Sequence, residues 1–249
     1  MMTRKFLAFL CVLCTLCGET ARASLVFGAA TSNRVTVTVA SGIGSTAFTV
    51  MVWAKPTTQT ANRRLWSLNG SGTQRAQATW QNADVNDFEF FIDRATTDAI
   101  LGTNISFSNN KNYFFAFTYD ESDGPRVFYR DLDTANSTVT EATYASRTVG
   151  TGATQTVVDD VIIGNRHAAS FNAAWQGTIS TFVWHNARLT QAELNVWAER
   201  PQPLAGTTKL FLELGWAGTG TQPDLSGNGN NGTVTGATVS NHVAKARYP

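Results

Sequence analysis

The chain has 249 residues, of which 19 are basic and 18 acidic, so its formal net charge is only +1. This balance, without any basic run longer than two residues, excludes the phosphate-neutralising surface on which nucleic-acid binding depends. All three cysteines lie within the first 17 residues, so the remainder contains no disulfide, thiol nucleophile or cysteine zinc site.

The first 23 residues have the pattern of a secretory signal peptide. Two basic residues precede an apolar run over residues 6–16, and an A-x-A cleavage site ends at Ala23. The apolar run is too short to cross a bilayer as a helix, which takes about 20 residues, and no later segment is a transmembrane candidate. We therefore expect a secreted protein without membrane insertion, in which residues 24–249 form a single domain.

Most of this domain is predicted to be β-strand. Runs rich in residues that suit a pleated, half-buried surface occupy residues 34–40, 47–56, 87–93, 112–120, 126–132, 156–164, 177–185 and 208–216. Turn-forming sequences such as Asn69–Gly70 and Asp123–Gly124 separate the runs. Many short strands at this spacing predict an all-β fold, a two-sheet jelly-roll sandwich.

One segment, LTQAELNVWAERP, departs from this pattern and predicts a short helix. Thr190 is its N-cap and Glu193 stands at the N3 position, and together they form a capping box. Leu194 and Trp197 lie three residues apart on one face of the helix, and we expect that face to dock onto the sandwich. Pro201 ends the helix.

A series of motifs gives the chain a resemblance to a known family. Laminin-G-like domains of the concanavalin A-like lectin/glucanase superfamily carry a motif series similar to FTVMVWAKP, NYFFAFTYDESDGPRVFYRDL, VIIGNR and WQGTISTFVWHNARLTQAEL, in that order. The resemblance covers most of residues 25–198, and its most specific part is the strand that leads into the helix. It implies a jelly roll with one concave face, in a family whose members mostly bind glycans or proteins, often with calcium at the rim. Some relatives in the superfamily hydrolyse β-glucans.

A cluster of acids lies in the segment DVNDFEFFIDR. Because side chains alternate along a strand, four outward positions are expected to share one face: Asp87, Glu89, Phe91 and Asp93. The glucan hydrolases of the superfamily carry three acids on a single strand, and retaining hydrolysis needs two carboxyl groups about 5 Å apart. Phe91 stands where one of those acids belongs, so we expect no catalysis. The carboxylates are interpreted either as a sugar-binding groove on the concave face or as a solvated outward face.

Three of the seven tryptophans, Trp66, Trp80 and Trp175, lie beside polar or loop sequence. Exposed indole rings stack on the C–H faces of sugars, so these three are candidate ligand-binding residues. Ordinary packing in the core is the alternative. Core packing is also the expectation for three tryptophans in apolar stretches: Trp53, Trp184 and Trp197.

The segment DLSGNGNNGTVTG, residues 224–236, supports two interpretations. Asp224 and Asn228 alternate with turn residues as in a calcium loop, but Thr235 occupies the twelfth position, where a bidentate glutamate belongs. Oxygens from this loop could still form a weak rim site for Ca²⁺, joined by Asp160. The alternative is an exposed turn that joins two C-terminal strands, with Asn231–Gly232 as a hairpin turn.

These patterns predict a secreted, non-catalytic recognition domain for carbohydrate, with a glycan or a surface protein as its partner. The alternative is a structural or adhesion protein of a surface layer, fibre or virion, and a glycoside hydrolase ranks third. The three histidines form no zinc-binding motif. An exposed aromatic beside a groove would favour glycan binding, whereas a large flat apolar patch or unpaired strand edges would favour assembly.

Overall fold

The computed structural model describes most of the chain beyond the predicted signal peptide. Its described residues are 23–28, 30, 32–39, 43–57, 60, 62–70, 72–81, 87–166, 173–203 and 206–241. The predicted signal peptide lies outside them except for Ala23, which begins the first strand, and His167 and His242 lie outside them as well. Among the described residues, no helix has both the length and the apolarity needed to cross a membrane.

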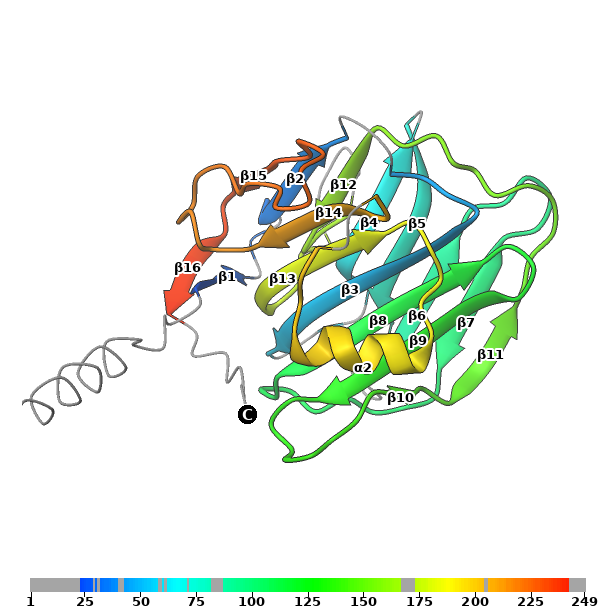
Figure 1. Ribbon diagram of the computed structural model, residues 1–249, viewed down its shortest axis with the longest axis horizontal. Coiled ribbons are helices and arrows are strands. Elements are labelled where there is room, and N and C mark those ends of the chain that lie inside the picture. Colours follow the sequence, from blue (N-terminus) through cyan, green and yellow to red (C-terminus); the bar gives the residue numbers. More distant parts are fainter. Residues whose placement is uncertain are drawn as a thin grey trace, which may run out of the picture.

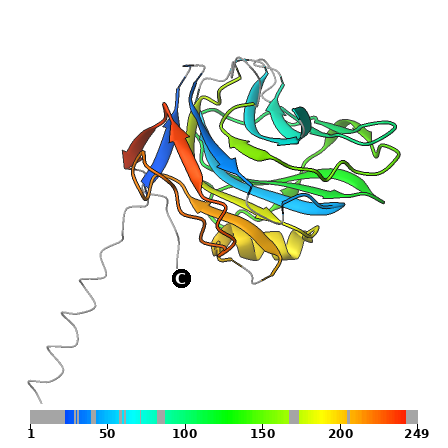
Figure 2. The ribbon, with the colours of Figure 1, turned by 90° about the horizontal axis from the view of Figure 1, so that it is seen from above.

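The strands form two antiparallel sheets that pack face to face (Figures 1 and 2). Sheet A has eight strands in the described chain: β1 (Ala23–Phe27), β3 (Ala47–Pro56), β8 (Tyr113–Asp120), β9 (Gly124–Asp131), β10 (Thr140–Glu141), β13 (Gly177–His185), β14 (Thr208–Glu213) and β16 (Thr238–Asn241). They lie in the order β10-β9-β8-β3-β13-β1-β16, and β14 also pairs with β13. Strands β1 and β14 lie end to end along one edge of β13, because Leu25 pairs with Ile179 and Glu213 with Thr181.

Sheet B also has eight strands within the described residues: β2 (Arg34–Thr38), β4 (Arg63–Gly70), β5 (Thr73–Trp80), β6 (Phe88–Ile92), β7 (Ala99–Thr103), β11 (Tyr144–Thr148), β12 (Asp160–Ile163) and β15 (Gly232–Thr235). Their order is β11-β7-β6-β5-β4-β12-β2-β15. The predicted all-β sandwich is confirmed. The sequence pattern does not predict β4 and β5, because these two strands contain few of the β-branched residues that are enriched in strands.

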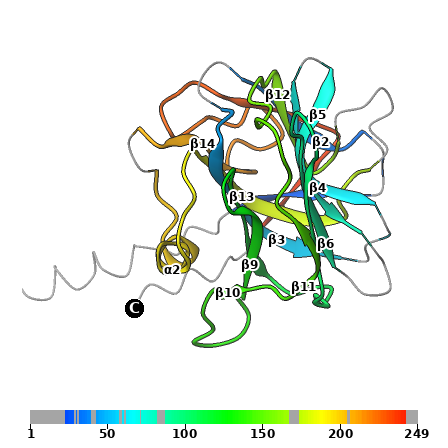
Figure 3. The same ribbon diagram turned by 90° about the vertical axis from the view of Figure 1, so that its right-hand side faces the viewer.

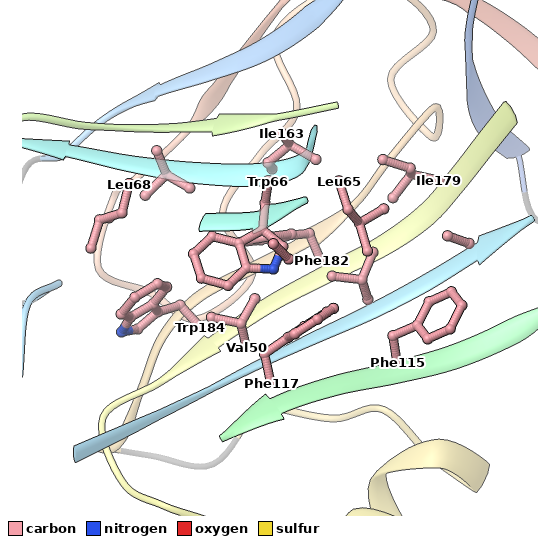
Figure 4. Close-up of a cluster of buried hydrophobic side chains, with 14 of the residues drawn as sticks. Val50, Leu65, Trp66, Leu68, Phe115, Phe117, Ile163, Ile179, Phe182 and Trp184 are labelled. Atoms are coloured by element: carbon pink, nitrogen blue, oxygen red, sulfur yellow. The ribbon is translucent and has the colours of Figure 1, made fainter. Parts of the chain in front are cut away.

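The core between the sheets is built from the inward-facing half of each strand. Along β6 (FEFFI), every second side chain is buried and those between are half-buried, which is the alternation expected when one face of a strand meets the core. Aromatic rings meet edge to face around Trp66, whose ring centroid lies 5.9 Å from that of Phe117 and 6.0 Å from that of Trp184 (Figure 4). Such pairs stabilise a core beyond the area they bury.

The predicted helix is present as α2 (Gln191–Glu199) on the outer face of sheet A, away from sheet B (Figure 3). Its capping box is confirmed: the Thr190 hydroxyl accepts a hydrogen bond from the backbone N–H of Glu193, whose carboxylate accepts one from the backbone N–H of Thr190. Leu194 and Trp197 are buried, as predicted. They belong to a second apolar cluster with Met51, Trp53, Phe114, Ala116, Phe128, Val139, Val183, Leu189, Ala198 and Phe211. The protein's own helix therefore occupies the outer face of sheet A.

The last three strands alternate between the sheets. Strand β14 lies in sheet A, β15 in sheet B and β16 again in sheet A, so the segment 224–236 carries the chain from one sheet to the other. The prediction of a hairpin turn at Asn231–Gly232 is wrong, because Gly232 already pairs with Val37 of β2. A sequence can show that a turn is present, but long-range pairing decides which strands it connects.

Candidate functional site

The outer face of sheet B is the broad face that no helix covers in the part of the chain that the structure describes (Figure 3). Strands β5 and β6 are neighbours in this sheet, and their outward side chains alternate with the residues of the core. Two rows of cross-strand neighbours run over it. One row contains Arg64, Thr79, Glu89 and Gly102, and the other contains Ser67, Gln77, Phe91 and Ile100.

The first row combines the carboxylate of Glu89 with the guanidinium of Arg64, and a second arginine, Arg166, is close enough to Arg64 to affect its charge. Burial, and then the positive charge of Arg166, lower the pKa of the Arg64 guanidinium to about 10, while the carboxylate of Glu89 acts in the opposite direction. Arg64 therefore stays protonated at neutral pH. The Nε atoms of Arg64 and Arg166 are buried and have no hydrogen-bond partner. This part of the face thus contains positively charged guanidinium groups in which at least one N–H donor forms no hydrogen bond.

The second row supplies an aromatic surface. The ring of Phe91 is half-buried, and its neighbours across the strands are Gln77 on β5 and Ile100 on β7. The side-chain amide of Gln77 is hydrogen-bonded to that of Gln74, which holds it in place. An apolar strip of Phe91 and Ile100 therefore lies directly beside the polar row that contains Glu89.

The three predicted carboxylates have different surroundings. Glu89 lies between Thr79 and Gly102 in the first row. Asp93 follows the end of β6 and forms an ion pair with Arg75, in which the two side chains are only 19% and 13% exposed, so its charge is already neutralised. Asp87 precedes β6 and is half-buried. Of the three, Glu89 is the acid best placed to bond a ligand on this face.

The predicted sugar-stacking tryptophans are not on the surface. Trp66, Trp80 and Trp175 are each 0% exposed and belong to the core, so the prediction that they bind ligand is wrong. The reason is strand alternation: on β4 and β5 the polar neighbours of the tryptophans point outward, and the tryptophans themselves point inward. Their indole N–H groups are buried without a hydrogen-bond partner.

The exposed tryptophan is Trp216, which the sequence pattern placed in a strand. It is 67% exposed, whereas each of the other six tryptophans is 8% exposed or less. Strand β14 ends at Glu213, and Trp216 lies in the turn that follows. The signal that sequence reasoning missed is its setting among small residues, in GWAGTG, which is typical of a loop rather than a strand.

The loop that begins at Asp224 is held by its own carboxylate. Oδ1 accepts hydrogen bonds from the backbone N–H groups of Phe211 and Ser226, and Oδ2 accepts one from that of Asn230, all at 3.0 Å. The Asn228 side-chain amide donates to the backbone oxygen of Thr208 at 3.0 Å. These bonds fasten the loop to β14, so the carboxylate that was predicted to bind calcium faces backbone donors instead.

The residues predicted to bind calcium do not fit a metal site. Asp160 lies on β12 of sheet B, opposite Asn69, while Asp224 is bonded to β14 of sheet A. Within the described residues, no group of three or more histidine, cysteine, aspartate or glutamate side chains is arranged to hold a metal ion. Calcium requires six to eight oxygen ligands, and the donor set around Asp224 consists largely of N–H groups. The hydrogen bonds of the loop at 224–231 are those of a structural turn fastened to β14.

A groove of about 320 Å³ lies beside the N-terminus of α2, lined by Arg126, Phe128, Glu141, Arg188, Leu189, Thr190 and Gln191. Its arginines are engaged in a network around Asp123, which forms ion pairs with Arg126, Arg147 and Arg188. The hydrogen bond from Arg188, against a smaller opposing effect of burial, lowers the pKa of Asp123 to about 2. Arg126 also pairs with Glu141. The network fastens the turn between β8 and β9 to β11 and to the segment before α2.

Comparison with known proteins identifies the family and the fold of this chain. Residues 29–195 match the Laminin_G_3 family model, which describes the concanavalin A-like lectin/glucanases superfamily. A candidate carbohydrate-binding protein from Bacteroides ovatus is 16% identical, with a TM-score of 0.63 over 90% of this chain and 60% of its own. The heptameric SAP-like pentraxin of Limulus polyphemus is 11% identical, with a TM-score of 0.60 over 91% of this chain and 97% of its own.

The zebrafish Gpr126/Adgrg6 extracellular region is also similar, with 15% identity and a TM-score of 0.53 over 88% of this chain and 26% of its own. Identities this low show a shared fold alone. The chain spans 60% of the length of the Bacteroides ovatus protein. No curated protein matches the sequence significantly.

Proposed function

Because the chain belongs to the Laminin_G_3 family of the concanavalin A-like lectin/glucanases superfamily, we propose that it is a secreted, non-catalytic domain that binds carbohydrate on the outer face of sheet B. The observation that carries this proposal is the half-buried ring of Phe91, which lies on the outer face of sheet B beside the row that contains Glu89.

A sugar ring has an apolar C–H face and a rim of hydroxyl groups, and this face of sheet B offers a surface for each. Phe91 and Ile100 present apolar surface to the ring. The carboxylate of Glu89 accepts hydrogen bonds from hydroxyl groups, and the guanidinium of Arg64 donates them. A few polar groups beside an apolar surface are the usual composition of a small-ligand site.

Binding without hydrolysis is favoured by the environment of the acids on β6. Retaining hydrolysis needs a second carboxyl group about 5 Å from the first. Phe91 occupies the outward position next to Glu89, and the following acid, Asp93, is ion-paired with Arg75. Reducing-sugar release from β-1,3- and β-1,4-glucans tests this part of the proposal, and release that disappears in Glu89→Gln would make the protein a hydrolase.

Secretion is supported by the signal pattern that ends at Ala23. Cleavage before Ser24 would leave the pairs of Leu25, Val26 and Phe27 with β13 intact. The intact mass of secreted protein tests this step. A mass that includes residues 1–23 would contradict it.

The main experiment is calorimetric titration with soluble hexasaccharides of β-1,3-glucan, β-1,4-glucan, xylan and chitin. We expect at least one to bind, and both Phe91→Ala and Glu89→Gln to weaken that binding about tenfold or more, as loss of a central contact does. Val196→Ala is the matched control, because Val196 is 60% exposed on α2, on the far side of sheet A. Binding that both face variants leave at the wild-type value would place the site elsewhere.

A further inference from the structure

The exposed Trp216 lies on a loop that is held rigidly in place. The side chain of Gln222, which is 0% exposed, accepts a hydrogen bond from the backbone N–H of Gly215 at 2.8 Å. Its amide donates to the backbone oxygens of Gly218 at 3.1 Å and Gly220 at 2.9 Å. A single buried glutamine therefore fixes three backbone positions around the tryptophan.

The loop is also fastened at both ends. The backbone of Gln222 exchanges hydrogen bonds with Gly232 of β15, at 2.7 and 2.8 Å. At the other end, Gly215 has φ of +89° and lies so close to β1 that a Cβ there would be 2.8 Å from the carbonyl carbon of Ser24. A residue with a side chain would not fit at that position. The loop that carries Trp216 is thus anchored to β1 at Gly215 and, at Gln222, to β15, the last strand of sheet B.

Tryptophan is rarely exposed to this degree, since its large ring is highly buried on average. An exposed aromatic on a fixed loop loses little conformational entropy when a ligand stacks on it, and this pre-organisation is what makes aromatic contacts effective in binding. The exposure of Trp216 therefore requires a functional explanation more than that of a valine or leucine does.

The residues that follow Trp216 in its loop fit a sugar better than a protein partner. A stable protein interface buries about 800 Å² on each side around an apolar centre. Within the loop, the neighbours of Trp216 are Ala217, Gly218, Thr219 and Gly220, none of which adds a large apolar side chain. Nothing lies within 4 Å of the position that a Cβ would take at Gly218, and the exposed Thr219 provides a hydroxyl group for hydrogen bonding.

We propose that Trp216 is the stacking platform for a pyranose ring, a second carbohydrate contact on the loop that is bonded to the edge strand β15. This inference rests on the proposed carbohydrate-binding function, and it places a glycan contact away from the outer face of sheet B. Its ligand is a neutral or charged oligosaccharide that presents the C–H face of one ring to the indole.

The test uses tryptophan fluorescence of the full secreted chain. Iodide, a charged quencher, reaches exposed indoles, and the six other tryptophans are buried, so Trp216→Phe should abolish most of the iodide quenching. The probes are the same glucan, xylan and chitin hexasaccharides. We expect the hexasaccharide that binds to protect Trp216 from iodide, Trp216→Ala to weaken its binding about tenfold or more, and Trp216→Phe to weaken it less.

The outcomes separate this inference from the proposal on which it rests. If a hexasaccharide binds Trp216→Ala as tightly as the wild type and leaves iodide quenching unchanged, the stacking role is wrong while carbohydrate binding stands. If protection of Trp216 persists in Phe91→Ala, the edge contact binds sugar independently of the face of sheet B. If no hexasaccharide binds the wild-type protein, both assignments are wrong.

Discussion

Replacing Asp224 with alanine removes the acceptor that holds the 224–231 loop against β14. In the structure its carboxylate accepts three backbone hydrogen bonds, from Phe211, Ser226 and Asn230. Phe211 is 3% exposed and Asn230 0%, so two of these donors would lose their partner in places that water reaches poorly. A buried donor left unsatisfied costs about 1–3 kcal/mol, so we expect Asp224→Ala to lower the free energy of unfolding by about 2–4 kcal/mol.

Urea unfolding followed by circular dichroism measures this change. Glu199→Ala is the matched control, because Glu199 is 62% exposed in its ion pair with Arg130, and removing an exposed ion pair changes stability by less than about 1 kcal/mol. Asp224→Asn should lie between the two, since it keeps one acceptor oxygen but turns an NH₂ group toward the remaining donors.

A variant Asp224→Ala that unfolds at the wild-type urea concentration would refute this reasoning. A calcium effect would refute it in another way. If millimolar CaCl₂ stabilised the wild type but not the variant, the carboxylate would serve a metal, and the calcium interpretation of DLSGNGNNGTVTG would be right. We expect calcium to shift the two proteins equally or not at all.

Three further predictions concern stability. Thr190→Ala should lower the free energy of unfolding by about 0.5–2 kcal/mol through loss of the capping box, and an unchanged urea midpoint would contradict the cap. Because the folded pKa of Asp123 is lowered from 3.8 to about 2, its stabilising contribution is complete above pH 4 and is lost as the pH falls toward 2. Urea unfolding over this pH range should therefore show a steeper loss in the wild type than in Asp123→Asn, and parallel curves would exclude this role. Gly177→Ala should lower the free energy of unfolding by about 3 kcal/mol or more, because φ is +143° and a Cβ would lie 2.1 Å from the backbone oxygen of Lys55. Gly227→Ala, where φ is +84° and nothing lies near the Cβ position, should lower it by only about 1 kcal/mol. Equal losses in the two variants would rule out the clash at Gly177.

Local pattern was sufficient for the elements that have strong local signals. The alternating Val and Thr of β2, the apolar run of β3 and the capping box of α2 each follow from a few neighbouring residues. The motif series also predicted the family. Strands β4 and β5 were not predicted, because they are stabilised by their position between β6 and β12. A short stretch of sequence does not show that position.

The candidate site was predictable only in part, because the register of each strand in the sheet decides which of its side chains face outward. Alternation along β6 predicted that Glu89 and Phe91 share the outward face, and they do. The same rule, applied to Trp66 and Trp80 without knowledge of their strands, could not show that they point inward. Polar neighbours do not indicate that these tryptophans are exposed, because in a half-buried strand a polar residue implies that the adjacent residue is buried.

The exposure of Trp216 follows from pairing between strands that are far apart in the sequence. Along β13, the position that would continue β14 beyond Glu213 is occupied by the start of β1, since Thr181 pairs with Glu213 and Ile179 with Leu25. After Leu214, which donates its last sheet hydrogen bond to Ser180 at 2.8 Å, the chain must leave the sheet. The apolar run of residues 208–216, which is predicted to be one strand, therefore leaves the sheet at the point where β1 takes its place beside β13. Trp216 is at the end of this run, outside the sheet, and is therefore exposed to solvent.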